Sequence, residues 1–297
     1  MTFRDVRSSV FETHAKGDYQ ASLDAIDAYR GESDDEQFDL SFWRVCLLSR
    51  LGRTDDACAE FSRRMDQGSW WGEGMLQDPD LENMRSHPEW QRLVNASIKR
   101  ARGEVNGPRS PIDKSPQGDV RATLVAFHGG AERPDMMVDR CASAVERGWR
   151  VVALHGTAPA AAERFGWPLT NCEQVVTQQL EEVGDLVAPI MIGFSQGGGL
   201  AGHLAWSGHI ASAGVILVAP AMGIRGVPIP SPKLAPVKTY LLVGSDDWAL
   251  DDSRHAAEAL DQSGAPVRLD VRPGMGHDWP FDFDEILQRG MEWILNG

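Results

Sequence analysis

The sequence has few basic residues for its length. Of its 297 residues, 29 are Lys or Arg and 43 are Asp or Glu, which gives a formal net charge of -14 at pH 7. Proteins that bind nucleic acids need a basic surface, because much of their affinity comes from releasing the cations that surround the phosphates. The composition therefore argues against a nucleic-acid partner and is typical of an acidic surface exposed to water.

Long apolar runs are also missing. The first five residues, MTFRD, already contain two charges, and no apolar core of a secretory signal follows them. No apolar run approaches the roughly 20 residues that a helix needs to cross a bilayer. We therefore expect no secretory signal, no membrane span and a cytoplasmic location.

Cysteine is scarce, with four residues at Cys46, Cys58, Cys141 and Cys172. They form no CxxC pair and lie near no cluster of histidines. Scattered thiols of this kind are typical of a reducing compartment. We therefore expect neither a disulfide nor a metal site.

The first 100 residues have the pattern of helices. Apolar residues recur every three or four positions from Val10 to Tyr29, from Phe38 to Leu51 and from Asp55 to Met65. Two segments also match at a spacing of 35: a Gly at 17 or 52 is followed five positions later by a small residue at 22 or 57. Helical hairpins of the tetratricopeptide (TPR) type repeat with a period of about 34 residues, so we predict a TPR-like helical region at 1–100.

Two hairpins are fewer than the three or more repeats that usually form a stable stack. We therefore expect this region to need further packing, for which Trp70-Trp71 and the stretch from Leu81 to Val94 are candidates. The two tryptophans could instead line a ligand groove. The same helices are the candidates for binding a protein partner or a second copy of the chain.

Beyond residue 100 the pattern of apolar residues is no longer that of helices alone. Residues 101–119 are rich in Gly-Pro and Ser-Pro pairs and are predicted to be a linker. Short, almost continuous apolar strands then alternate with helices, which predicts an α/β domain at 120–297 with a mostly parallel sheet covered on both faces. The strands are expected at 122–127, 150–154, 189–194, 215–218, 239–243 and 267–271.

The motif Gly193-Phe194-Ser195-Gln196-Gly197 follows one of these strands and precedes a helix. A sharp turn at such a place lifts the serine hydroxyl above the sheet edge, and the flanking glycines remove clashes. A hydroxyl is a weak nucleophile unless a base accepts its proton. We therefore predict Ser195 as a nucleophile and look for its base.

The best placed histidine is His277, in the loop after the last strand. His155 also ends a strand, but it precedes Ser195. In α/β domains with a serine at such a turn, the order along the chain is serine, acid, histidine. The acid should end a strand between the two, where Gly244 is followed by Asp246 and Asp247. Asp247 has the separation from Gly244 expected of this turn, and Asp246 is the alternative.

Backbone N–H groups must stabilise the negative oxygen that forms on the substrate. The loop His128-Gly129-Gly130 ends the first strand and offers such donors, and the N–H of Gln196 follows the nucleophile directly. We predict Gly130 and Gln196 as the two donors.

Residues 120–297 resemble the α/β-hydrolase superfamily. The run Gly193-Phe194-Ser195-Gln196-Gly197-Gly198 is similar to that of its carboxylesterase/phospholipase branch, which includes acyl-protein thioesterases and dienelactone-hydrolase relatives. The resemblance implies hydrolysis of esters or thioesters through an acyl-enzyme, without a cofactor or metal, by Ser195, Asp247 and His277. The minimal family has no counterpart of the first 100 residues.

The substrate implied is a small ester or acyl compound. The short stretch between Pro220 and Pro236 leaves no room for a large cap, which predicts an open site. Trp167, Met222 and Trp248 are candidates either for lining an acyl pocket or for packing in the core. Two other functions stay open: a serine peptidase of the same fold, and a non-catalytic TPR-type interaction protein that keeps the hydrolase part as a scaffold.

Overall fold

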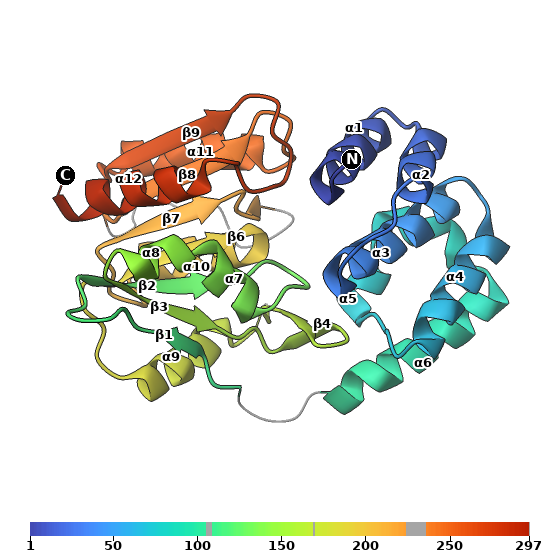
Figure 1. Ribbon diagram of the computed structural model, residues 1–297, viewed down its shortest axis with the longest axis horizontal. Coiled ribbons are helices and arrows are strands. Elements are labelled where there is room, and N and C mark those ends of the chain that lie inside the picture. The colour runs from blue at the N-terminus through green and yellow to red at the C-terminus, as the bar shows by residue number, and fades with distance from the viewer. Residues whose placement is uncertain (105–108, 169, 224–235, 297) are drawn as a thin grey trace. The chain divides into compact units, whose positions relative to one another are not determined.

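The chain forms two compact units. The computed structural model describes residues 1–104, 109–168, 170–223 and 236–296 (Figure 1). The first unit comprises Met1–Asn106 and Pro159–Ala162, and the second comprises Gly107–Ala158 and Glu163–Gly297. Within the predicted linker, a helix continues to Glu104 and a short strand lies at Ile112–Lys114. The domain limits drawn from the sequence stay a prediction.

The first unit is helical. It contains α1 (Phe3–Ala15), α2 (Tyr19–Asp27), α3 (Asp34–Arg50), α4 (Thr54–Asp66), α5 (Glu73–Leu76), the 3-10 helix η1 (Pro79–Met84) and α6 (Pro88–Glu104). Gly17 ends α1 with φ +77° and Gly52 separates α3 from α4 with φ +72°. A side chain is strained in this left-handed conformation, so glycine stops each helix and lets the chain turn back. The helical stretch expected from Val10 to Tyr29 is therefore two helices.

The small residues five positions after these glycines lie at helix contacts. Ser22 and Ala57 are both fully buried, and α1 packs on α2 as α3 packs on α4. The Ser22 hydroxyl lies 2.6 Å from the Thr13 hydroxyl on α1. Both positions thus have the close helix approach expected from the sequence repeat, while the TPR-like nature of the unit stays a prediction.

Aromatic side chains form the core of this unit. Trp70 and Trp71 are 3% and 0% exposed, so they belong to the core rather than to an open groove. The Trp71 ring stacks on Phe61 with centroids 4.3 Å apart, and Phe61 also contacts Trp90 at 5.2 Å. The Trp71 backbone forms an isolated β-bridge with Ala161 of the same unit.

The second unit is built on a seven-stranded sheet (Figure 1). Its strands are β1 (Ile112–Lys114), β2 (Ala122–Phe127), β3 (Trp149–Leu154), β6 (Ile190–Phe194), β7 (Gly214–Val218), β8 (Lys238–Gly244) and β9 (Val267–Arg272). Their order is β1-β3-β2-β6-β7-β8-β9. The β1 strand is antiparallel to β3, and each other neighbouring pair is parallel. The sequence predicted six of these strands and missed β1; it also missed β4 (Ala158–Ala161) and β5 (Arg164–Gly166), which form a two-stranded sheet.

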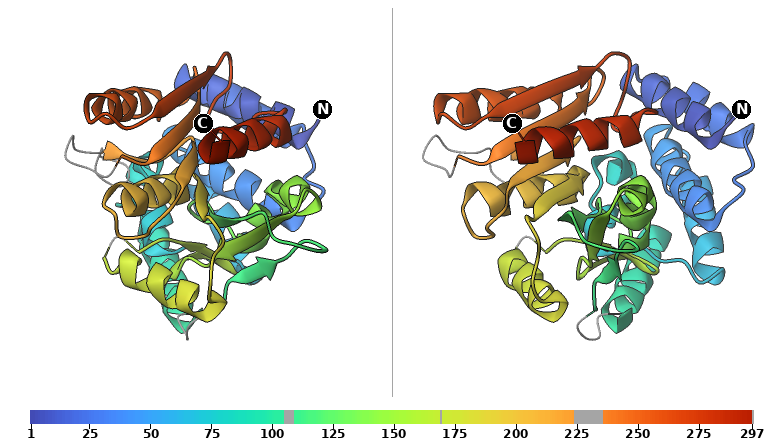
Figure 2. Two further views of the ribbon diagram at one scale, coloured as in Figure 1. Left: turned by 90° about the vertical axis from the view of Figure 1, so that its left-hand side faces the viewer. Right: turned by 60° about the vertical axis from the view of Figure 1, so that its left-hand side comes forward.

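Helices cover both faces of the large sheet (Figure 2). They are α7 (Pro134–Arg140), α8 (Ala142–Glu146), α9 (Cys172–Val183), α10 (Ser195–Trp206), α11 (Leu250–Gln262) and α12 (Phe283–Asn296). Alternate residues of each strand enter opposite cores: Leu124 packs in a cluster with α7, α8 and α12, whereas Val125 packs in one with α9, α10 and α11. Burial on both faces explains why these strands are almost continuously apolar. Because these strands run parallel, the carboxyl ends of β2, β6, β8 and β9 lie along one edge of the sheet.

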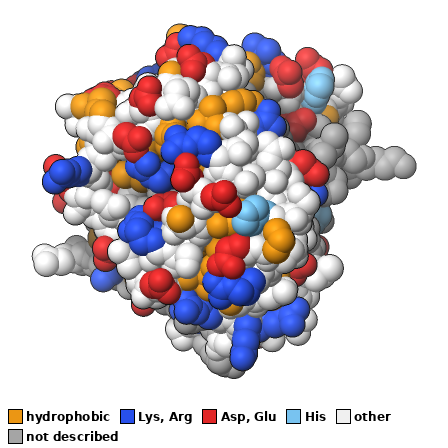
Figure 3. Space-filling view, turned by 90° about the vertical axis from the view of Figure 1, so that its right-hand side faces the viewer, with side chains coloured by type: hydrophobic (Ala, Val, Ile, Leu, Met, Phe, Trp, Pro, Cys, Tyr) orange, Lys and Arg blue, Asp and Glu red, His pale blue; other side chains and the backbone are white. Residues whose placement is uncertain are grey.

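The surface shows no large area of a single charge on the face drawn in Figure 3, where acidic and basic side chains are interspersed. Among the helices that the structure describes, none is both long enough and apolar enough to span a membrane. The four cysteines are free thiols, and Cys46, Cys58 and Cys141 are buried.

Replacing Trp71 with Ala tests the aromatic core of the first unit. We expect Trp71→Ala to lower the free energy of unfolding by about 3–5 kcal/mol, because it leaves a cavity beside Phe61. The matched control is Phe11→Ala, since Phe11 is 38% exposed and should cost only about 1 kcal/mol. Urea denaturation followed by circular dichroism measures both, and equal losses would contradict this description of the core.

Candidate active site

The predicted nucleophile lies at a sharp turn between a strand and a helix. Ser195 is the first residue of α10 and directly follows β6. Its φ of +50° places it in the left-handed region, which costs energy for any residue with a side chain. The conformation persists because the turn is held on both sides, and the Ser195 carbonyl accepts a hydrogen bond from Ala221 N–H at 2.8 Å.

Close backbone packing requires glycine on either side of Ser195. A Cβ atom at Gly193 would lie 2.4 Å from the Gly197 carbonyl oxygen. A Cβ atom at Gly197 would lie 2.2 Å from the His128 carbonyl oxygen and 2.5 Å from that of Phe127. These distances are far below van der Waals contact, so the two glycines let α10 start against β6 and against the end of β2.

Three of the predicted residues form a hydrogen-bonded chain. His277 Nε2 lies 2.9 Å from Ser195 Oγ, and His277 Nδ1 lies 2.9 Å and 3.1 Å from the two carboxylate oxygens of Asp247. Because a carboxylate only accepts, Nδ1 carries the proton and Nε2 accepts from the serine hydroxyl. Asp247 is 6% exposed, and one of its oxygens also accepts the N–H of Ala249 at 2.8 Å. The carboxylate is thus buried and hydrogen-bonded on two sides.

The competing carboxylate is turned away from His277. Asp246 is exposed, and its side chain accepts a hydrogen bond from the hydroxyl of Ser245 at 2.8 Å. Its backbone N–H donates to the Met275 carbonyl at 3.0 Å. Of the two aspartates that the sequence left open, Asp247 is the one that contacts the imidazole.

The acid loop and the histidine loop are joined by their backbones. Gly244 lies so close to the histidine loop that a Cβ atom there would be 1.8 Å from the Met275 carbonyl oxygen. The Ser245 hydroxyl accepts the N–H of Gly274 at 2.8 Å. The far end of the histidine loop is closed by Arg272, which donates to both carboxylate oxygens of Asp282 at 2.7 and 2.8 Å. These links could not be predicted from the sequence, because each depends on two loops meeting in space.

The imidazole of His277 contacts two aromatic rings. Trp248 stacks on it with centroids 4.6 Å apart, and Phe194 contacts it at 5.2 Å. Trp248 is 40% exposed, so its ring extends from His277 toward solvent. Of the three candidates for lining an acyl pocket, Trp248 is the one in contact with His277.

The other two such side chains are buried. Met222 is 0% exposed and lies in the core cluster with α9, α10 and α11. Trp167 is 3% exposed and belongs to the same cluster. The structure thus places both in the core, which the sequence had left as one of two possibilities. Most of the stretch between Pro220 and Pro236, whose shortness predicted an open site, lies outside the described residues.

The loop at 128–132, which we call the oxyanion loop, contains the predicted donor Gly130. Within the described residues, the N–H groups of Gly130 and Gln196 donate to no acceptor. The neighbouring N–H of Gly129 is already bound to the Glu132 carboxylate at 2.6 Å. The two predicted donors are therefore available, and an ideal Cβ at Gly130 would be 3.4 Å from the Gln196 side chain.

His128 holds the base of this loop as a neutral imidazole. It is fully buried; its Nε2 accepts the N–H of Gly156 at 2.9 Å, so its Nδ1 carries the proton and donates to the Gly129 carbonyl at 2.7 Å. Burial lowers the pKa of His128 to about 4. The ring therefore stays uncharged at neutral pH and supports the loop without taking part in proton transfer.

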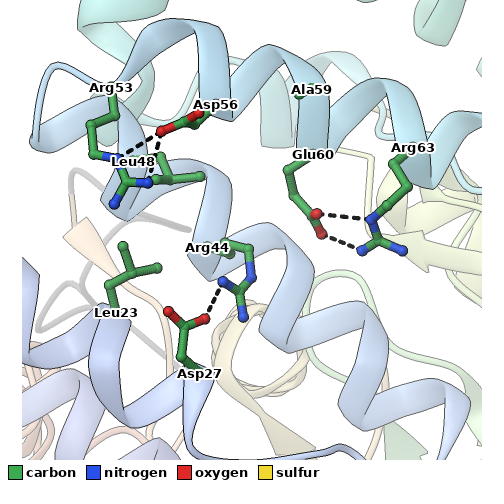
Figure 4. A pocket seen from close by; sticks show the side chains of 9 residues that line it. All are labelled: Leu23, Asp27, Arg44, Leu48, Arg53, Asp56, Ala59, Glu60 and Arg63. Atoms are coloured by element: carbon green, nitrogen blue, oxygen red, sulfur yellow. Dashed lines mark hydrogen bonds and ion pairs between the residues drawn. The ribbon is translucent and has the colours of Figure 1, made fainter.

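A separate groove of about 320 Å³ lies in the first unit (Figure 4). Three arginines line it, and each is paired with an acid: Arg44 with Asp27, Arg53 with Asp56, and Arg63 with Glu60. The groove therefore offers no excess of either charge for a charged partner. The partner role of these helices stays a prediction.

No metal-binding arrangement is evident in the described ranges: no three His, Cys, Asp or Glu side chains are grouped so that they could hold an ion.

Comparisons with known proteins define the fold. No protein-family model and no curated protein matches the chain. Solved structures do match. Esterase PE8 is 17% identical to this chain, with a TM-score of 0.51, and the match covers 63% of this chain and 99% of that one. The Bacillus cereus carboxylesterase is 16% identical, with a TM-score of 0.51, and the match covers 62% of this chain and 94% of that one. TT1662 from Thermus thermophilus is 18% identical, with a TM-score of 0.50, and the match covers 63% of this chain and 94% of that one. The chain has the α/β-hydrolase fold with additional N-terminal helices, as the sequence predicted.

Exchanging each aspartate for asparagine tests the choice of acid. We expect Asp247→Asn to lower kcat for ester hydrolysis about 10⁴-fold, because asparagine stabilises the wrong tautomer of His277. Asp246→Asn is the matched control, and its kcat should stay within a factor of about 3, as befits an exposed turn residue. Steady-state kinetics decide, and a larger loss in the Asp246 variant would overturn the assignment.

Acid should destabilise the protein through His128. Its pKa is about 4 in the folded protein and about 6.5 when unfolded, so the unfolded chain binds the extra proton and stability is lost as pH falls from 6.5 toward 4. His128→Gln removes this titration, and we expect its melting temperature to fall less between pH 7.5 and pH 4.5 than that of the wild type. Carboxylates titrate in both proteins and cancel in the comparison. Parallel declines would refute a buried neutral His128.

Proposed function

We propose that the chain is a serine hydrolase that cleaves carboxylic esters or thioesters through an acyl-enzyme on Ser195. The observation that carries this proposal is the hydrogen-bonded chain from Ser195 through His277 to the buried Asp247. The left-handed turn at Ser195 and the two available N–H groups beside it support the same chemistry. The fold is shared with solved esterases, which agrees with the proposal at the level of architecture.

In the first half of the reaction, Ser195 Oγ attacks the carbonyl carbon while its proton moves to His277 Nε2. The imidazolium that forms is stabilised by Asp247. The carbonyl oxygen becomes negative and is held by the N–H groups of Gly130 and Gln196. The bond to the leaving oxygen or sulfur then breaks, and His277 returns the proton to the leaving group. The products are an alcohol or thiol and the acyl-enzyme.

In the second half, water takes the place of the leaving group. His277 accepts a proton from water as the water oxygen attacks the acyl carbon, and the same two N–H groups hold the second oxyanion. The bond to Ser195 Oγ breaks and the serine recovers its proton from His277. The acid is released, and the side chains return to their first state without any cofactor.

A fluorophosphonate probe tests the proposal, because it reacts with activated serines. We expect covalent labelling of the wild type and none of Ser195→Ala, whose ester turnover should fall by roughly 10⁴-fold or more. Ser143→Ala is the control, since Ser143 is a partly exposed serine whose hydroxyl donates to Asp284, and its loss should leave labelling intact. Mass spectrometry of the labelled peptide locates the site.

The alternative functions give different outcomes. A protein that is labelled but hydrolyses peptide amides faster than matched 4-nitrophenyl esters or acyl thioesters would be a peptidase of the same fold. A protein that is neither labelled nor active on any of the three would be the non-catalytic interaction protein. A series of 4-nitrophenyl esters of increasing chain length would then define the acyl preference.

A further inference from the structure

We propose that the short strand β5 and the residue after it, Trp167, act as a brace that holds the oxyanion loop, and that Trp167 is a positioning residue of the active site. This inference rests on the hydrolase function proposed above. Neither β5 nor Trp167 contacts Ser195 or His277 through a described hydrogen bond. Their effect on catalysis would therefore be transmitted through the backbone of residues 128–132.

Three hydrogen bonds join the brace to the oxyanion loop. The indole N–H of Trp167 donates to the His128 carbonyl at 2.8 Å. The backbone N–H of Phe165 donates to the Glu132 carbonyl at 3.1 Å. Arg164 donates from its guanidinium to the Ala131 carbonyl, also at 3.1 Å. The brace thus grips the loop at its first residue and at its last two.

Arg164 donates its hydrogen bond to a residue with a strained backbone, Ala131. Ala131 has φ +59°, a left-handed conformation that a residue with a Cβ adopts only when its surroundings impose it. Arg164 is 5% exposed, so its hydrogen bond to Ala131 is sheltered from competing water. Gly130, the proposed donor, directly precedes this strained residue. Loosening the brace would let Ala131 relax and would turn the Gly130 N–H.

The brace is also tied to the second donor. The Gln196 side chain accepts the N–H of Trp167 through Oε1 and donates to its carbonyl through Nε2, both at 3.0 Å. Gly166 makes room for this pairing, since a Cβ atom there would lie 2.9 Å from Gln196 Oε1. The backbone of Gln196 therefore presents one oxyanion donor while its side chain fixes the brace that positions the other.

This geometry explains why two N–H groups from distant parts of the chain could keep a constant separation. Oxyanion stabilisation depends on donors that are already in place before charge develops, because reorganisation during the reaction costs part of the gain. A loop rich in glycine is intrinsically flexible. The brace supplies the rigidity that residues 128–132 lack by themselves.

The variant Trp167→Phe tests the proposal, because it keeps an aromatic ring in the core but removes the indole N–H. We expect kcat for a 4-nitrophenyl ester to fall about 10-fold, which is less than the roughly 100- to 1000-fold loss caused by removing a whole oxyanion donor. KM should change by less than a factor of about 2, because the bound substrate makes little use of the two oxyanion donors before the reaction. Binding of a trifluoromethyl ketone, whose adduct with Ser195 carries the oxyanion, should weaken by the same factor as kcat/KM.

Trp206→Phe is the matched control. Trp206 is also buried, and its indole N–H also makes one buried hydrogen bond, to the Thr239 hydroxyl at 3.0 Å. We expect this variant to lose a similar amount of thermal stability but to keep the kcat of the wild type. If both variants lose kcat equally, or if Trp167→Phe keeps the wild-type kcat and ketone affinity, the brace is refuted.

A second variant covers the case in which Trp167→Phe does not fold. Gln196→Met breaks the link to Trp167 and leaves the Gln196 backbone N–H in place, so it should also lower kcat with little change in KM. In the double variant the two losses should be smaller than their product, because both act on the same loop. Full multiplicativity would overturn the shared brace. A wild type without probe labelling or turnover would instead refute the hydrolase proposal itself.

Discussion

The close approach of β6, α10 and the end of β2 is the constraint on which the rest of the second unit depends. At Gly197 the backbone of α10 comes so near to the His128 carbonyl that no side chain could fit between them. The same packing accompanies the left-handed conformation of Ser195 and brings the oxyanion loop beside this residue. The strain at Ser195 is tolerated because burial of the helix and the strands on either side stabilises the whole arrangement. The hydroxyl and the donors are therefore placed by backbone packing, before any polar contact is considered.

The sheet edge then supplies the proposed base and the proposed acid from strands that are neighbours in space. Asp247 and His277 follow β8 and β9, whose ends lie side by side, and Gly244 lets the two loops come within hydrogen-bond distance. The imidazole is fixed in three ways: by the Asp247 carboxylate at Nδ1, by Ser195 at Nε2, and by ring contacts with Phe194 and Trp248. A ring held in this manner loses little freedom when it accepts a proton, which is the purpose of preorganisation in a proposed base.

The sequence predicted the fold and the candidate residues wherever the information is local. Six strands of the sheet could be found because they are short apolar runs bounded by turns, and Ser195 could be found because its glycines are adjacent in the chain. Asp247 and His277 followed from chain order. The β1 strand escaped because only three residues of a polar linker form it at the edge of the sheet. The strands β4 and β5 escaped because they are three or four residues long and carry no apolar alternation, so only their partners in space define them. The contacts of Glu132, Arg164 and Trp167 could not be predicted for the same reason, because their hydrogen-bond partners are backbone groups of the oxyanion loop.

Most backbone carbonyls of the oxyanion loop are held by hydrogen bonds. The carbonyls of His128, Gly129, Ala131 and Glu132 each accept a hydrogen bond, and the Gly129 N–H donates one. Among the described residues, the N–H of Gly130, an exposed residue, and the N–H of Gln196, at the half-buried start of α10, donate to no acceptor. Two N–H donors available beside Ser195 are what a developing negative oxygen requires. The hydrogen bonds that hold this loop and its two available donors are thus consistent with the hydrolase chemistry proposed for Ser195, His277 and Asp247.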